Sequence, residues 1–132
     1  ESRMVEGEYT LTVDDLKSLA RFDDAIAVAN YDIDIHNPEG SGTSHYYFGA
    51  GEWYQIPYRC LLPKDCTNLL VAGRCISSTH EAQASYRIMP FCAELGQAAG
   101  AAVSIAVKEH TTLRDVDIKE LQSILRSEGF VL

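Results

Sequence analysis

The chain has 132 residues, a formal net charge of -8 at pH 7 and a pI of about 4.8. This length allows one compact domain or part of a larger one. Because an acidic chain repels phosphate backbones and anionic lipid surfaces, we expect no nucleic-acid partner. Hydrophobic residues make up 46% of the sequence, but no apolar run is long enough to predict a membrane span.

The cysteines and the first residues bear on the cellular context. Cys60, Cys66, Cys75 and Cys92 form no C-x-x-C pair and no Cys/His set at zinc spacing, so we expect reduced, mostly buried thiols. The chain opens at Glu1 without a basic and apolar leader. We therefore expect it to begin inside a longer protein whose targeting region lies upstream, with a cytoplasmic location favoured.

Two short helices are expected near the beginning of the chain. Thr12 and Asp14 are typical N-cap residues, and they precede a helix expected at about 15–20. A second helical stretch is expected at 23–29.

The segment 31–36 alternates strictly between polar and apolar residues, which predicts a half-buried strand with Ile33 and Ile35 facing inward. Carboxylate and imidazole groups on its outer face are possible metal ligands. A solvated polar face is the favoured interpretation, so we predict no metal site. The outer residues are Asp32, Asp34 and His36. Residues 37–42 are expected to form a loop.

An aromatic segment follows this loop, with glycines at 49 and 51 that predict a turn between strands. Arg59, directly after this segment, could clamp a substrate carboxylate between tyrosine walls. Core packing is the competing role for these rings. The six aromatic residues are Tyr46, Tyr47, Phe48, Trp53, Tyr54 and Tyr58.

The second half predicts a strand and two helices. The unalternating apolar run 68–72 is typical of a strand buried on both faces. Pro90 fits the first turn of a long helix that reaches about Lys108. Gly96 and Gly100 weaken this helix, so we expect close packing against a sheet to compensate for them.

The last predicted element is a surface helix with recognisable start and stop signals. Asp117 and Glu120 form a D-x-x-E capping signal, and Gly129 fits the position just after the helix. One face of this helix is apolar. Its members are Ile118, Leu121, Ile124 and Leu125.

The stretch 68–106 combines a buried strand, a Gly-Arg turn, a polar loop and a helix rich in small residues. A helix N-terminus has unpaired N–H groups and a positive dipole end. These favour the negative charge that develops near N1 and the C2 carbonyl of a reduced isoalloxazine ring. The stretch is therefore chemically suited to a flavin.

Nearly the whole chain resembles the end of the bacterial FAD-dependent oxidoreductase family. The resemblance rests on 68–106 together with ESR at 1–3, GEYTLT at 7–12, DIH at 34–36 and IPYRCLLPK at 56–64. It implies a two-lobed flavoprotein whose N-terminal part binds the FAD pyrophosphate through G-x-G-x-x-G, a motif that this chain lacks. Met4 replaces a second basic residue that relatives often have after ESR.

The resemblance implies an α/β fragment, in which 1–60 belongs to a substrate-side lobe and 61–132 completes an FAD-binding domain. The parent enzyme would pass a hydride or electrons between an organic small-molecule substrate and FAD, while the fragment alone would be inactive and would not retain FAD. Its partners would be the missing FAD-binding portion and, through exposed surfaces, a second copy. The flavin contacts carried over are Gly73, Arg74, Ser85, Arg87, Met89, Pro90 and Gly96.

Three residues are candidates for the chemistry itself. His80 could transfer protons beside the flavin, Arg87 could stabilise negative charge, and Arg59 could hold the substrate. A solvated histidine and surface ion pairs are the competing interpretations. The alternative function is a self-contained, non-enzymatic α+β binding module that uses its aromatic segment for recognition. In such a module protein groups should cap the long helix, whereas in a flavoprotein remnant its N-terminus should face a concavity.

Overall fold

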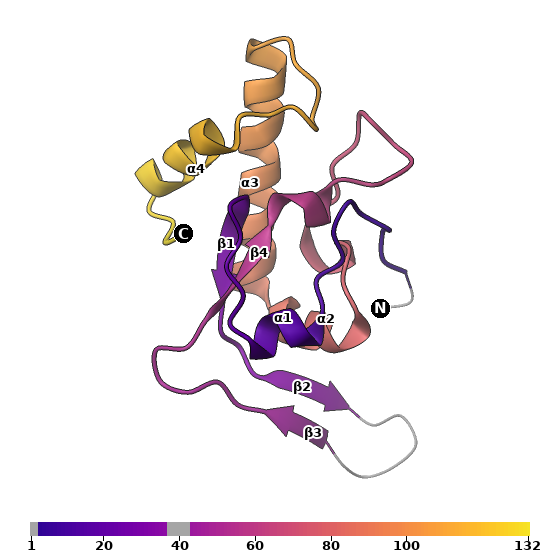
Figure 1. Ribbon diagram of the computed structural model, residues 1–132, viewed down its shortest axis with the longest axis vertical. Helices are drawn as coiled ribbons and strands as arrows, with labels where there is room; N and C mark the ends of the chain where they lie inside the picture. The colour runs from indigo at the N-terminus through magenta and orange to yellow at the C-terminus, as the bar shows by residue number, and fades with distance from the viewer. Residues whose placement is uncertain (1–2, 37–42) are drawn as a thin grey trace.

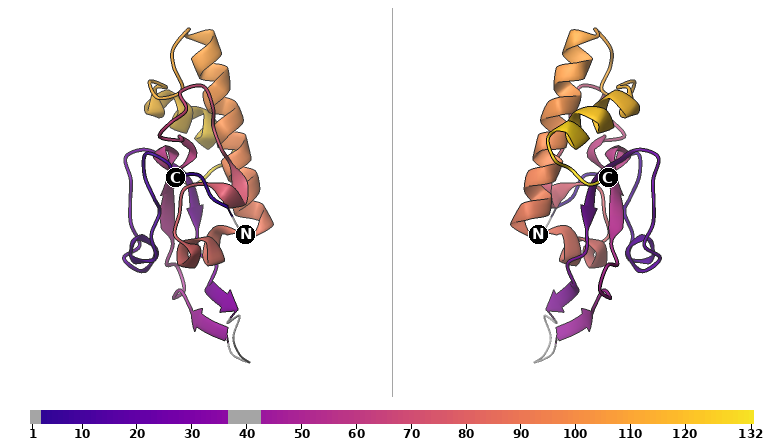
Figure 2. Two further views of the ribbon diagram at one scale, coloured as in Figure 1. Left: turned by 90° about the vertical axis from the view of Figure 1, so that its right-hand side faces the viewer. Right: turned by 90° about the vertical axis from the view of Figure 1, so that its left-hand side faces the viewer.

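The computed structural model describes residues 3–36 and 43–132. Its centre is an antiparallel ribbon of β1 (Ala25–Ala29) and β4 (Tyr54–Pro57). The long helix α3 (Met89–Lys108) covers one side of this ribbon, and the short helix α1 (Val13–Lys17) lies on the other side (Figure 1 and Figure 2). The combination of helices with small antiparallel sheets confirms the expected α/β class.

The prediction of a helix at 23–29 is wrong, because Ala25–Ala29 forms strand β1. Ala27 pairs with Ile56 and Ala29 with Tyr54 across the ribbon. Ile26 is fully buried. Pairing with β4 satisfies the backbone of this run and buries most of it, and this tertiary gain outweighs the local helix preference of alanine.

The hairpin of β2 (Ile33–His36) and β3 (Thr43–Tyr46) extends away from the ribbon (Figure 1). The predicted strand is confirmed, with Ile33 buried and Ile35 packed against the core. Asp34 pairs with His45 on the opposite face of the hairpin. The loop expected at 37–42 lies outside the described residues.

Two of the six rings of the aromatic segment, Tyr54 and Tyr58, belong to the core, and the others are half-buried or exposed. β4 is buried along its whole length, and Tyr58 is buried at the start of the short 3₁₀ helix η1 (Tyr58–Leu61). The predicted glycine turn is present, because the Glu52 N–H donates to the Gly49 carbonyl at 3.0 Å and Gly51 has a φ of +82°. Of the rings in this segment, Tyr47 is the most exposed, at 68%.

The predicted end signals of two helices are confirmed. Thr12 caps α1 in a reciprocal capping box with Asp15, although α1 begins two residues earlier than expected. Asp117 caps α4 (Ile118–Ser127) by accepting from two backbone N–H groups. Gly129 follows α4 with a φ of +97°, a conformation in which glycine has no Cβ clash.

Helix α3 begins and ends where the sequence predicted. By length and composition it could cross a membrane, with a mean hydropathy of 1.3, but the core helix of a soluble protein passes the same test. One face packs on β1 and α4. A Cβ at Gly96 or Gly100 would have no atom within 4 Å, so described residues do not provide the close packing expected there. The buried residues of α3 are Leu95, Ala98, Ala102, Ile105 and Ala106.

The strand predicted at 68–72 is not formed, so this prediction is wrong for the chain by itself. The run has no assigned secondary structure, and Leu69 is 47% exposed. Its single backbone–backbone hydrogen bond to a described residue joins the Val71 N–H to the Leu61 carbonyl at 2.9 Å. The Ala72 carbonyl also accepts from the Cys75 thiol at 3.6 Å. Without a paired strand on its other side, the run has no partner that would fix it as sheet.

Candidate functional site

A hollow of about 570 Å³ lies at the N-terminal end of α3. Two segments of the chain form its walls. The 3₁₀ turn η2 (Gly73–Cys75) forms one wall, and the first turn of α3 forms the other. The lining residues are Arg74, Cys75, Met89, Cys92 and Ala93.

The start of α3 has the properties expected of an anion-favouring helix end. Ile88 is the N-cap residue, and its side chain makes no capping hydrogen bond. Pro90 occupies the first turn, where its missing N–H costs nothing. Met89 is 78% exposed. The first-turn N–H groups of a 20-residue helix are therefore left without a side-chain cap beside the hollow.

A hydrogen bond links the turn η2 to the short connection between α2 and α3. Gly73 has a φ of +81°, which a residue with a side chain adopts only under strain. The Arg74 Nε–H donates to the Arg87 carbonyl at 2.8 Å. The terminal guanidinium nitrogens of Arg74 make no bond to a described residue, so they remain available to an anion.

A buried tyrosine, Tyr86, is hydrogen-bonded to the same turn from the core side. The Tyr86 hydroxyl shares a hydrogen bond with the Ser78 hydroxyl at 2.8 Å and donates to the Arg74 carbonyl at 3.3 Å. Burial raises the pKa of Tyr86. The phenol therefore stays protonated and keeps its donor role at physiological pH.

Arg87 connects the hollow to the β2–β3 hairpin. Its backbone carbonyl accepts from Arg74 and from the Cys92 thiol, the latter at 3.5 Å. Its side chain reaches Asp34, with 3.6 Å between Nη2 and Oδ2. His45 approaches the other oxygen of that carboxylate at 3.6 Å. The predicted role of Arg87 in charge stabilisation remains a prediction, since its guanidinium already faces Asp34.

Three predicted residues lie away from the hollow. Ser85 is fully buried and shares a 2.7 Å hydrogen bond with the Tyr54 hydroxyl, while it also donates to the Tyr31 carbonyl. His80 is exposed in the first turn of α2 (His80–Tyr86). Gly96 lies on the open face of α3. Their carried-over roles remain predictions.

Arg59 is held by a partner within the chain. Its guanidinium donates to both oxygens of Asp24, at 2.9 and 3.2 Å. This bidentate geometry is the one proposed for a substrate carboxylate. In this structure an internal carboxylate occupies it, which favours the surface ion-pair interpretation over a substrate clamp.

Sequence reasoning missed the two thiols of the hollow and was wrong to expect mostly buried cysteines. Cys60 alone is buried, Cys66 and Cys92 are half-buried, and Cys75 is exposed. One signal was available, because Cys92 follows Met89 by three residues and therefore lies on the same side of α3. No metal-binding group of His, Cys, Asp and Glu occurs among the described residues.

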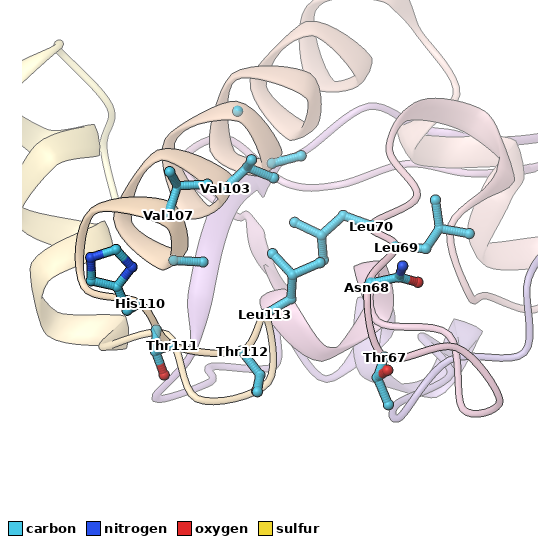
Figure 3. A pocket seen from close by; sticks show the side chains of 13 residues that line it. Thr67, Asn68, Leu69, Leu70, Val103, Val107, His110, Thr111, Thr112 and Leu113 are labelled. Atoms are coloured by element: carbon cyan, nitrogen blue, oxygen red, sulfur yellow. The ribbon is translucent and has the colours of Figure 1, made fainter.

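A larger groove, of about 1010 Å³, lies along the C-terminal half of α3 (Figure 3). It contains none of the predicted site residues. Val103 and Val107 line its helix side, and Leu69 and Leu70 lie across from them. The groove is mainly apolar, although Thr67, Asn68, His110, Thr111 and Thr112 also line it.

Comparison with known proteins identifies a family for the chain. A family model described as FAD dependent oxidoreductase matches residues 1–125. Searches of curated proteins and of solved structures found no match. The matched segment includes both η2 and the start of α3. With nearly the whole sequence matched, the chain belongs to the FAD-dependent oxidoreductase family.

Proposed function

We propose that this chain forms one wall of the flavin site in an oxidoreductase that passes a hydride or electrons between an organic small molecule and FAD. The observation that carries the proposal is the convergence of Arg74 and the uncapped start of α3 on one hollow. Both features favour negative charge. Bound FAD would supply the redox chemistry, since it accepts and donates electron pairs.

The residues present fit one part of the cofactor. FAD joins a flavin ring system, a pyrophosphate and an adenosine, and the hollow offers lining residues for only one of these parts. Arg74 and the α3 N-terminus would hold an anionic oxygen there. The chain has no G-x-G-x-x-G for the pyrophosphate. We therefore propose that another FAD-binding portion completes the site and that the chain alone is inactive.

Three elements of the chain keep this wall in place. The Arg74–Arg87 hydrogen bond ties the turn to the helix start, and Tyr86 supports it from the core. Gly73 gives the backbone the positive φ that the turn requires. A wall fixed before the cofactor arrives loses little conformational entropy on binding, which is the condition for effective charge stabilisation.

The structure gives less support to a self-contained binding module. Such a module was expected to cap α3 with protein groups and to present its aromatic segment. Instead Ile88 provides no side-chain cap, and Tyr54 and Tyr58 are buried. The open helix start favours the flavoprotein.

Flavin affinity tests this proposal. In the enzyme that carries this chain, Arg74→Ala should weaken FAD binding by roughly tenfold or more, because a hydrogen bond to a charged group contributes about 1.5–3 kcal/mol. Exposed Arg126 on α4 provides the matched control, and Arg126→Ala should leave the affinity unchanged. Fluorescence titration of the isolated chain should show weak binding or none. Tight stoichiometric binding by the chain alone, or an unaltered affinity in Arg74→Ala, would contradict the proposal.

A further inference from the structure

Sulfur is concentrated in the hollow at the start of α3. The chain has four cysteines and two methionines, and Cys75, Met89 and Cys92 are three of the five residues that line this hollow. Neither cysteine is in a disulfide. We propose that Cys75 and Cys92 form a redox-active dithiol that exchanges with small organic disulfides. That such disulfides are the substrate class of the complete enzyme rests on the proposed function.

Hydrogen bonds to one carbonyl oxygen bring the two thiol-bearing segments together. The Arg87 carbonyl accepts from the Cys92 thiol at 3.5 Å and from the Arg74 Nε–H at 2.8 Å. Cys75 directly follows Arg74 in the turn η2, and this turn packs against α3. The two cysteines therefore face one hollow from segments that are joined beside it.

The Tyr86 phenol gives independent evidence that both thiols are near each other. Burial is the main cause of its raised pKa, and charges on Cys60, Cys92 and Cys75 raise it further. The Tyr86 hydroxyl also donates to the Arg74 carbonyl at 3.3 Å, next to the Cys75 N–H in the chain. Because Cys60 is fully buried, only the two thiols that line the hollow can meet a dissolved molecule.

The difference in exposure between the two cysteines assigns their roles. Cys75 is exposed on a three-residue turn, whereas Cys92 is half-buried near the start of a 20-residue helix. A dissolved disulfide reaches the exposed thiol first. Cys75 is therefore the attacking thiol, and Cys92 is the thiol that resolves the intermediate.

The exchange takes place in two balanced steps. The Cys75 thiolate attacks one sulfur of the substrate disulfide, forms a mixed disulfide and releases the other half as a thiolate, which takes up the proton that Cys75 lost. The Cys92 thiolate then attacks the Cys75 sulfur, closes the protein disulfide and releases the second half of the substrate, again with one proton. The substrate gains two electrons and becomes two thiols, while the protein dithiol loses two electrons.

The hollow itself favours a small substrate. Its volume of about 570 Å³ lies within the range of small-molecule pockets. The Met89 side chain, 78% exposed, offers an adaptable apolar contact to the carbon groups beside the substrate sulfurs. Arg74, proposed above to hold an anionic oxygen of FAD, directly precedes Cys75. Reduced FAD in the complete enzyme would therefore lie close enough to return two electrons to the protein disulfide.

Thiol release from hydroxyethyl disulfide, a small uncharged probe, tests the inference without any flavin. The test uses the reduced chain with Cys66→Ser, because Cys66 is the other cysteine that is not buried. Each chain should release two equivalents of mercaptoethanol, and its mass should fall by that of two hydrogen atoms. Peptide mapping should then find Cys75 joined to Cys92.

Single substitutions separate the two roles. Cys92→Ser should release one equivalent and retain the other half of the probe on Cys75, because no second thiol resolves the mixed disulfide. Cys92→Ala repeats this test without a hydroxyl to bury at a half-buried position. Cys75→Ser should slow the release by about tenfold or more, since the exposed thiol is lost. Far-ultraviolet circular dichroism checks that each variant is folded.

Three outcomes would overturn the inference. They are mixed disulfides on both cysteines with no bond between them, a protein disulfide that includes Cys60, or an unchanged rate of release in Cys75→Ser. Because the test contains no flavin, each of these outcomes is distinct from an unchanged flavin affinity in Arg74→Ala, which contradicts the proposed function alone.

Discussion

Two five-residue apolar runs of this chain end up in opposite states. AIAVA at 25–29 is a paired strand in the core, whereas NLLVA at 68–72 is unpaired and partly exposed. Local preference alone does not explain the difference, because both runs mix strand-favouring residues with residues that are depleted in strands. The two runs differ in whether a second strand lies beside them. Strand β4 pairs with the first run and helps to bury it, whereas no described segment pairs with the second run as a strand.

The largest expected effect is a difference in stability between the two runs. Ile26→Ala should lower the free energy of unfolding by about 2–5 kcal/mol, because it leaves a cavity beside a fully buried position. Leu69→Ala should change it by much less, by roughly 0.5 kcal/mol, because that side chain is already 47% exposed. Urea unfolding of the two variants measures both values. Equal losses would show that the second run is already part of the core.

Thiol reactivity provides a second comparison, because one cysteine follows each region. Burial raises the pKa of Cys60, just after β4, to about 12. Cys75, just after the second run, is exposed. With an aromatic disulfide reagent at pH 8, Cys75 should react at least about a hundredfold faster than Cys60, because the thiolate is the reactive form. Cys75→Ser should remove one rapid thiol and Cys60→Ser none. A rapid phase lost in Cys60→Ser would contradict the burial of that region.

The smallest effect concerns the helix that faces the second run. Gly100→Ala should stabilise the isolated chain by up to about 1 kcal/mol, since alanine is the better helix former and the new methyl group meets nothing. Gly129→Ala is the contrasting control and should destabilise by about 1–2 kcal/mol, because its φ of +97° disfavours a side chain. Thermal unfolding measures both. A loss of stability in Gly100→Ala would mean that the chain already packs against this face.

The candidate site could be predicted only in part. The order of a Gly-Arg turn, a polar loop and a proline-started helix indicated the hollow, and Arg74 and Met89 do line it. The surroundings of Ser85 could not be predicted from the sequence, because its hydroxyl is hydrogen-bonded in the core to Tyr54, which lies 31 residues away in the chain. Arg59 was misleading for a similar reason, because its partner Asp24 is brought near by the pairing of β1 with β4.

The sequence by itself determined the features that depend on neighbouring residues. Capping at Thr12 and Asp117, the extent of α3, the alternation around Ile33 and the turn at Gly51 all arise from contacts within a few positions. The tertiary structure decided whether each apolar run became a strand, because backbone pairing requires a second segment at the right distance. An alanine-rich run became sheet where β4 met it, and a strand-like run stayed open where no described segment did.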